Sequence, residues 1–237
     1  MDTQEIVKAF RKLRVADISD ACDANGLFFQ VMHQNMRPLQ EGLYSVGGDG
    51  CMCGQAYTLH GLVSQYPVPE NRTWEDYHRA IDPPGLLETY LNLLEKLNDR
   101  VCVTDLGGAP LGFWGSDNSM AARNHGCIGI VIDGGIRDSH EMKKEGIRAW
   151  STSRTCLHLW PRLNGVEVDV PVMCAGVKVT PGDIICADDD GVVVVPLNQA
   201  EKVLAFAMKT LAWDQQTRRK NYDDAGMQHD ETLQPVE

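Results

Sequence analysis

The stretch FWGSDNSMAARNHGCIGIVIDGGIRDSHEMKKEG, residues 113–146, indicates the fold of this chain. Its centre is an apolar run at 127–132, short and rich in β-branched side chains, which predicts a strand buried on both faces. The Asp-Gly-Gly sequence at 133–135 should end this strand in a turn. A helix is expected before the strand, from Gly115 to about His125, and another after it.

A second unit of the same kind lies just before this one. Residues 101–105 form an apolar run that predicts a buried strand, ended by Leu106-Gly107-Gly108. Residues 86–97 have apolar side chains at helical spacing and predict a helix. Successive β-turn-helix units are typical of parallel βαβ structure, so we expect an α/β protein with a parallel sheet at its centre.

The N-terminal part is expected to contribute two helices and a strand. Residues 5–14 and 17–26 predict the helices, and Asp17 is expected to cap the second. Asn25-Gly26 should end that helix through a left-handed residue, with the helix acids on a solvated face. Residues 54–59 predict a strand.

The segment 63–84 differs from the rest of the chain because it has four prolines and no clean periodicity. We interpret it as a surface excursion. Long ordered loops in compact domains are often functional, so Trp74, Tyr77 and His78 could line a substrate pocket. Packing of Trp74 and Tyr77 against the body of the protein explains them equally well.

After Gly146 the sequence becomes β-rich, with strands predicted at 166–170, 172–179, 183–187 and 191–195. The acidic triplet before Gly191 is expected to be a hairpin turn, with cation binding as the alternative. Residues 197–220 predict a final helix. We therefore expect a single domain over 1–220 and a polar tail over 221–237. The tail is expected to have no core to join, and to form a mobile extension or an arm on a neighbouring subunit.

Composition argues against several classes of protein. With 237 residues, 43% of them hydrophobic, the chain can build a sizeable core. A net charge of −11 argues against nucleic-acid binding, which needs clustered Lys and Arg. The first residues lack the pattern of a signal peptide, and no apolar run has the length of a membrane span. We expect a cytoplasmic protein without a membrane partner.

The eight cysteines are expected to be buried, reduced thiols rather than metal or redox sites. Cys51-Met52-Cys53 is the one close pair in the sequence, and such a pair without a second pair or a nearby His is weak as a metal site. The cysteines that stand singly within apolar segments are Cys22, Cys102, Cys127, Cys174 and Cys186.

Two predicted helix starts carry the candidate site. If the strands are parallel, both helix starts lie at the edge of the sheet where α/β proteins bind ligands. The amides of Gly115, Ser116, Asp117 and Asn118 would bind an anionic group such as a carboxylate. On the neighbouring loop, Arg137 offers a planar fork for a second oxygen. Asp138 beside it can hold a divalent cation or position a water.

These residues also have purely structural explanations. Asp138-Ser139-His140-Glu141 fits a capping box in which Asp138 caps the amide of Glu141. Arg137 could be a solvated surface residue, and Ser116 an ordinary helix cap. His125 and His140 are expected at the surface near helix ends, without a catalytic role.

Taken in order, five segments of the chain resemble the RraA-like family. Its members include class II 4-hydroxy-4-methyl-2-oxoglutarate/4-carboxy-4-hydroxy-2-oxoadipate aldolases and the regulator of ribonuclease activity A. The resemblance implies an α/β fold, a layered α/β/β sandwich with a central βαβ core, a β-rich C-terminal half and a C-terminal helix. It also implies homotrimers or homohexamers with active sites between subunits. The segments are 17–21, 115–122, 126–138, 181–184 and 187–196.

The resemblance further implies the chemistry of the site. Asp138 would hold Mg²⁺ or Mn²⁺, and Arg137 would bind the substrate. For Asp117 two alternatives are open: it reaches the metal through water, or the second carboxylate of the site is missing. The amides from Gly115 to Asn118 would bind a pyruvate carboxylate. The activity implied is that of a metal-dependent carbon–carbon lyase, an aldolase or oxaloacetate decarboxylase. It would act on a small 2-oxo acid and release pyruvate through an enolate that Arg137 and the metal stabilise.

One position departs from the family pattern. Aldolase members carry an acid directly after the glycine matched by Gly115, whereas this chain has Ser116 there and Asp117 next. A shift of one residue at a helix start turns a side chain by about 100°, which points to altered specificity. Two alternatives stay open: an enzyme of the same scaffold acting on a different small acid, and a non-enzymatic RraA-type regulator whose acidic surface binds an RNA-processing protein.

Overall fold

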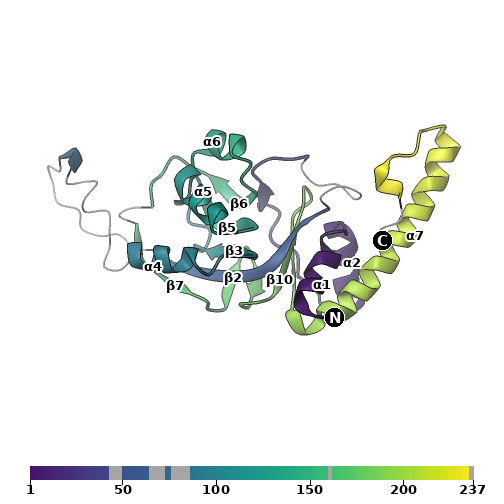
Figure 1. Ribbon diagram of the computed structural model, residues 1–237, viewed down its shortest axis with the longest axis horizontal. Helices are drawn as coiled ribbons and strands as arrows, with labels where there is room; N and C mark the ends of the chain where they lie inside the picture. The colour runs from purple at the N-terminus through teal and green to yellow at the C-terminus, as the bar shows by residue number, and fades with distance from the viewer. Residues whose placement is uncertain (43–49, 64–72, 76–85, 160–161, 235–237) are drawn as a thin grey trace.

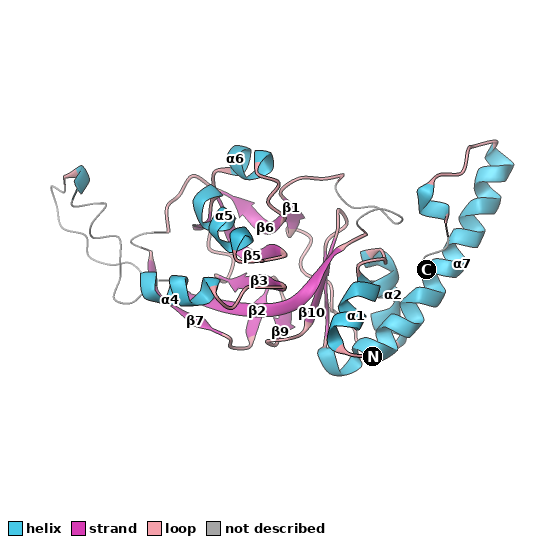
Figure 2. Ribbon diagram, viewed as in Figure 1, coloured by secondary structure: helices cyan, strands magenta, loops and turns pink. Residues whose placement is uncertain are grey.

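The computed structural model describes the chain except for residues 43–49, 64–72, 76–85, 160–161 and 235–237. A mixed sheet lies at its centre, with helices above it and at one end (Figure 2). The strands of this sheet are β1 (Arg37–Pro38), β2 (Met52–Val63), β3 (Arg100–Asp105), β4 (Gly112–Trp114), β5 (Gly129–Ile136), β6 (Ala149–Arg154), β7 (Leu163–Val168), β10 (Ile184–Ala187) and β11 (Val192–Val195).

Its strands lie in the order β1-β6-β5-β3-β2-β10-β11, with β4 paired to β5 and β7 to β2. The neighbours β2 and β3, β3 and β5, and β5 and β6 are parallel. A separate hairpin consists of β8 (Val172–Cys174) and β9 (Val177–Val179). The helices are α1 (Thr3–Phe10), α2 (Val15–Ala24), α4 (Leu86–Leu94), α5 (Ser116–Asn124), α6 (Ser139–Lys144) and α7 (Ala200–Ala225), with short 3-10 turns at Leu197–Gln199 and Glu231–Leu233.

Three layers stack at the centre of the molecule (Figure 1). On one face of the parallel strands, α4, α5 and α6 bury a core that includes Leu93, Ala122 and Ile132. On the other face, Val103 and Val131 pack in one cluster with the residues of the β8–β9 hairpin. The order helix, sheet, hairpin is the predicted α/β/β sandwich, and the β3-α5-β5 unit is the predicted βαβ core.

A third core lies at the β11 end of the sheet, where α1, α2 and α7 pack together. Phe10, Ile18, Val193 and Val203 are completely buried in it. Figure 1 shows the C-terminal half of α7 extending beyond these helices. Among the described residues, none of the helices combines the length and apolar character needed to cross a bilayer.

The glycine pair after the central apolar run does not form the expected turn. β5 continues through Gly134 and Gly135, where it pairs with β4 and β6. A Cβ on Gly135 would lie 2.8 Å from the Leu111 carbonyl oxygen, and one on Gly134 2.8 Å from a methyl of Leu106. The glycines are needed because neighbouring segments pack closely against the strand, and the prediction of a turn here is wrong.

The start of α2 also differs from the prediction. Its N-cap is Arg14, and Asp17 lies buried in the first turn, where its Oδ1 accepts a hydrogen bond of 2.6 Å from Arg14 Nη2. Arg14 also forms an ion pair of 2.7 Å with Asp214 of α7. Asp17 Oδ2 accepts from Arg14 N at 3.3 Å in a capping box, so Asp17 does cap the start of α2, from the first turn rather than from the N-cap position. Asp20 and Asp23 are exposed as predicted, but the prediction of a solvated face is wrong for Asp17, because α7 packs there. The predicted end is confirmed, with Gly26 left-handed at a φ of 75°.

The β-rich half matches the prediction with small shifts. The run 172–179 forms two strands, separated by left-handed Ala175 and Gly176. The hairpin at 188–191 is confirmed, since Asp188 N donates to Gly191 O at 3.1 Å and β10 pairs with β11 on either side. The Asp188 carboxylate accepts from the amides of Val15 and Asp190, both at 2.9 Å, so this acid has a structural role.

The C-terminal residues fold back onto α7, which runs to Ala225 rather than to 220. Leu233 is 1% exposed, and its 3-10 turn contacts α7. Gln215 of α7 donates to the carbonyls of Thr232 and Gln234, at 3.2 and 2.7 Å. The prediction that this tail has no core to join is therefore wrong.

The eight cysteines are all free. Six are buried, Cys127 is half-buried and Cys156 is exposed. The excursion predicted at 63–84 lies largely outside the described residues, as do Tyr77 and His78. Trp74 is described, and its side chain is largely exposed.

Candidate functional site

Asp138 stands between the end of β5 and the start of α6. It is the N-cap of α6 by position but adopts a left-handed conformation with a φ of 53°, and its side chain makes no cap hydrogen bond. Its Oδ2 instead accepts a hydrogen bond of 3.3 Å from Ser116 N, at the start of α5. The capping box predicted for Asp138 is therefore absent, and the carboxylate is turned toward the other helix start.

Gly115, the N-cap of α5, provides the space for this carboxylate. A Cβ at this position would lie 2.6 Å from Asp138 Oδ2 and 3.1 Å from Arg137 Cγ. The φ of Gly115 is −134°, an extended conformation that any residue can adopt. The requirement for glycine here is therefore one of space, and it brings the two predicted helix starts into contact.

The side chain of Arg137 lies against β4 and also reaches the space beside Gly115. Its backbone N donates to Trp114 O at 3.0 Å, and its Cδ would lie 3.0 Å from a Cβ on Gly112. Its Nε is 3.6 Å from Asp138 Oδ2. The side chains of Arg137 and Asp138 are 35% and 42% exposed, so both have surface to offer a ligand.

The first turn of α5 completes the group. Asn118 Nδ2 donates to Phe113 O at 3.3 Å, and Tyr90 of α4 donates to Asn118 O at 3.2 Å. Asp117 is exposed, and its charge adds to burial in raising the pKa of Tyr90 to about 12. The structure therefore joins Gly115, Ser116, Arg137 and Asp138 closely. Asp117 and Asn118 lie along the same turn with different neighbours.

Two residues beside this site were missed in the sequence. Glu145 lies at the end of α6, where its Oε1 accepts a hydrogen bond of 2.7 Å from Ser116 Oγ. Ser116 thus links both carboxylates, through its amide to Asp138 and through its hydroxyl to Glu145. The second missed residue is Tyr90. In the sequence, Glu145 was visible only as an acid at a helix end, and Tyr90 only as an aromatic residue within a helical pattern. Neither signal specifies a partner 28 or 29 residues away.

The donor set suits a hydrated divalent cation. The described contacts of the Asp138 carboxylate both engage Oδ2, and the side chain is partly exposed. Mg²⁺ typically keeps several waters and is bound through one or two carboxylates. Among the described residues no group of three or more His, Cys, Asp or Glu side chains is placed to hold a metal. A cation here would be held by Asp138 and water rather than by a protein cage.

Two cavities lie elsewhere. One, of about 310 Å³, lies at the carboxyl edge of the sheet and is lined by His33 and Asp133. The Asp133 oxygens accept from Thr152 Oγ1 at 3.1 Å and from Ala175 N at 3.0 Å, which gives this acid a structural role. The other, of about 440 Å³, lies at the opposite edge. The described linings of both omit Arg137 and Asp138, whose side chains are partly exposed.

Comparisons with known sequences find two informative relatives. A protein of Burkholderia multivorans named "Putative 4-hydroxy-4-methyl-2-oxoglutarate aldolase" is 32% identical over 184 residues, 74% of this chain and 93% of the relative. Protein DlpA of Legionella pneumophila is 26% identical over 189 residues, 80% of this chain. The matched segment spans only 27% of DlpA, so the chain corresponds to about a quarter of that protein.

Comparisons with solved structures and family models agree. The Streptomyces coelicolor protein RraAS2, described as an unusual member of the RNase ES inhibitor RraA protein family, superimposes with a TM-score of 0.72. It is 26% identical, and the match covers 92% of this chain and 97% of RraAS2. The model of the RraA-like family, described as Aldolase/RraA, matches residues 15–194. This match covers more than half of the chain, which therefore belongs to the RraA-like family.

Proposed function

We propose that this protein is a divalent-metal-dependent carbon–carbon lyase, of the aldolase or oxaloacetate decarboxylase type, that acts on a small 2-oxo acid and releases pyruvate. The observation that carries the proposal is the contact between two helix starts. The Asp138 carboxylate and the Arg137 guanidinium lie against Gly115 and are both partly exposed. The aldolase name of the Burkholderia multivorans relative supports the reaction class.

The first turn of α5 is suited to bind the substrate carboxylate. The first N–H groups of a helix have no intrahelical partner, and the positive end of the helix dipole favours an anion. One of these amides, Ser116 N, already donates to Asp138. A carboxylate bound to the following amides would therefore place the adjacent 2-oxo group close to Asp138 and Arg137.

Arg137 would stabilise the charge that develops in the reaction. Aldol cleavage and decarboxylation each break a carbon–carbon bond one carbon removed from the 2-oxo group and leave its electron pair on a pyruvate enolate. A guanidinium placed at the enolate oxygen stabilises both transition states. A Mg²⁺ or Mn²⁺ held by Asp138 and water would supply Lewis-acid polarisation of the same oxygen.

A neighbouring copy of the chain would complete the site in this proposal. Enzyme sites generally enclose their substrate, whereas Arg137 and Asp138 lie outside both described cavities and are 35% and 42% exposed. Homotrimers or homohexamers with sites between subunits would cover this surface. The assembly and a cytoplasmic location are part of the proposal.

The test is metal-dependent release of pyruvate. Purified protein is assayed with oxaloacetate and with 4-hydroxy-4-methyl-2-oxoglutarate, in Mg²⁺ or Mn²⁺ and in EDTA, with pyruvate coupled to lactate dehydrogenase. We expect turnover that EDTA abolishes and that Asp138→Ala lowers by at least two orders of magnitude. Asp20→Ala, which removes an exposed acid of α2, is the matched control. Equal rates with metal and with EDTA on both substrates would overturn the proposal.

The second candidate is a protein-binding regulator of an RNA-processing partner. The observation that favours it is the similarity to RraAS2 over nearly the whole chain. Calorimetric titration with Mg²⁺ separates the two functions, because only the lyase needs Asp138 to bind metal. Mg²⁺ binding by the wild type that is lost in Asp138→Ala favours the lyase. No binding and no turnover, together with inhibition of a ribonuclease, would favour the regulator.

A further inference from the structure

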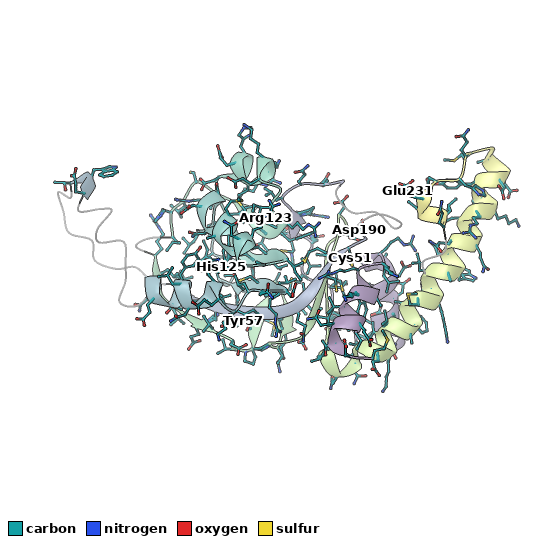
Figure 3. All side chains as sticks on the ribbon, in the orientation of Figure 1. Cys51, Tyr57, Arg123, His125, Asp190 and Glu231 are labelled. Atoms are coloured by element: carbon teal, nitrogen blue, oxygen red, sulfur yellow. The ribbon has the colours of Figure 1, made fainter. Side chains whose placement is uncertain are left out.

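The larger cavity lies at the amino ends of the parallel strands, away from Asp138. Its volume is about 440 Å³, and its lining includes Cys51 before β2, Asp99 before β3, Gly129 at the start of β5 and Arg148 before β6. Two residues of the cavity wall, Arg123 on α5 and Cys51 before β2, are labelled in Figure 3. The lyase site does not explain this cavity, because it lies at the opposite edge of the sheet.

Positive charge is concentrated around this cavity. Among the described residues of its lining, three are arginines, Arg11, Arg123 and Arg148, and one is an acid, Asp99. The protein as a whole has a net charge of −11, so the excess of positive charge at this cavity is opposite in sign to the net charge of the protein. Like charges gathered at a concave surface raise the local potential and attract anions.

Two of the guanidinium groups are held in place by backbone carbonyls. Arg11 Nε donates to Cys53 O at 3.1 Å, and Arg123 Nη1 donates to Glu145 O. Each of these bonds uses one of the five N–H donors of an arginine. Donors therefore remain on side chains whose position is already restricted, which lowers the entropy cost of binding a ligand.

Ser119 provides an independent observation. It lies in the lining of the same cavity, is 1% exposed, and its Oγ has no hydrogen-bond partner among the described residues. It stands three residues after Ser116 and four before Arg123, on one face of α5. Buried hydroxyl groups without a partner are rare in folded proteins because they are destabilising. A ligand oxygen in the cavity would provide the missing partner.

We propose that this cavity binds a small phosphate-bearing anion. Guanidinium forks match phosphate oxygens in bidentate geometry, and a hydroxyl can donate to a third oxygen. The volume exceeds that of a single phosphate, which favours a phosphorylated organic molecule or pyrophosphate over inorganic phosphate. The site is separate from the proposed lyase site, and its occupancy is measurable without turnover.

Calorimetric titration of the full-length protein with inorganic phosphate, pyrophosphate and AMP, at constant ionic strength set by KCl, tests the proposal. We expect saturable binding of pyrophosphate or AMP that is tighter than binding of phosphate. Arg123→Gln should weaken it at least tenfold, in line with the strength of charge-assisted hydrogen bonds. Arg37→Gln, which removes an exposed arginine of β1 outside the cavity, should leave it unchanged.

Ser119→Ala distinguishes binding from a structural role. Removal of an unpartnered hydroxyl should leave the melting temperature of the ligand-free protein equal or higher, while the affinity for the anion falls severalfold. Arg148→Gln provides a second charge variant if Arg123→Gln does not fold. The proposal would be overturned by an absence of binding to all three anions, or by equal weakening in Arg123→Gln and Arg37→Gln, which indicates non-specific electrostatic attraction.

Discussion

An ideal Cβ on Gly115 would lie 2.6 Å from Oδ2 of Asp138, closer than two such atoms can approach. The two residues are the N-cap positions of α5 and α6 and are 23 residues apart in the sequence. Their contact is possible because β4 and β5 run parallel and end side by side. The geometry of the proposed lyase site therefore depends on the absence of a side chain at position 115.

Gly115→Ala should displace the Asp138 carboxylate without unfolding the protein, because the φ of −134° is accessible to alanine. A misplacement of about 1 Å can cost about a hundredfold in rate, so we expect a loss of this size in pyruvate release together with weaker Mg²⁺ binding. Circular dichroism should be unchanged. Wild-type turnover and Mg²⁺ affinity in this variant would contradict the role given to the contact.

Arg137→Ala should lower the turnover number by about two to three orders of magnitude if Arg137 stabilises the enolate, since loss of one oxyanion partner has this effect. Arg137→Lys should recover only part of the activity, because an ammonium lacks the planar fork. Steady-state kinetics with oxaloacetate measures both. Arg37→Ala serves as the control for charge, and a change in KM alone in Arg137→Ala would assign this residue to ground-state binding.

Tyr90 should ionise late in a spectrophotometric titration, because burial and the charge of Asp117 raise its pKa to about 12. The unfolded chain has the ordinary value of 10.0 and loses its proton first. The stability due to the neutral phenol is therefore complete below pH 10 and is lost as the pH rises toward 12. Tyr90→Phe should remove the late absorbance change and flatten this part of the stability curve. Identical titration curves for the wild type and Tyr90→Phe would contradict the raised pKa of Tyr90.

Thr104→Val should destabilise the sheet although it preserves shape. Trp114 Nε1 donates to Thr104 Oγ1 at 3.0 Å, and both residues are completely buried. Valine would leave the indole N–H without a partner, which typically costs about 1–3 kcal/mol. Urea unfolding measures the free energy. Thr104→Ser keeps the acceptor and should cost less, so the reverse order would exclude the hydrogen bond as the cause.

Leu233→Ala should detach the C-terminal turn from α7. Leu233 is 1% exposed, and its carbonyl accepts a hydrogen bond from Arg219. Local opening of an end segment leaves the rest of a protein folded, so hydrogen exchange should accelerate in residues 226–234 and stay slow in β3 and β5. Met227→Ala, at a position that is mostly exposed, should change little. Uniform acceleration across the sheet would contradict a local role.

Much of the architecture could be predicted because it is encoded in local patterns. Apolar runs bounded by glycine predicted β3 and the start of β5. Helical spacing of apolar residues predicted α4, and the polar residues 115–118 that can open a helix predicted α5. The hairpin after Asp188 could be predicted because Asp and Gly adopt positive φ readily. Arg137 and Asp138 could be named as site candidates since they follow a buried strand, a position that depends only on the order of elements along the chain.

The sequence by itself determined the order of most strands and helices and the family to which the chain belongs. Only the tertiary structure decided what individual polar residues contact. Asp138 is turned away from its own helix and toward Ser116, Asp17 pairs with Arg14 beneath α7, and Leu233 is buried. Each of these outcomes involves segments that are distant in the sequence. Local propensity cannot specify such contacts, because they form only when the sheet and its helices pack together.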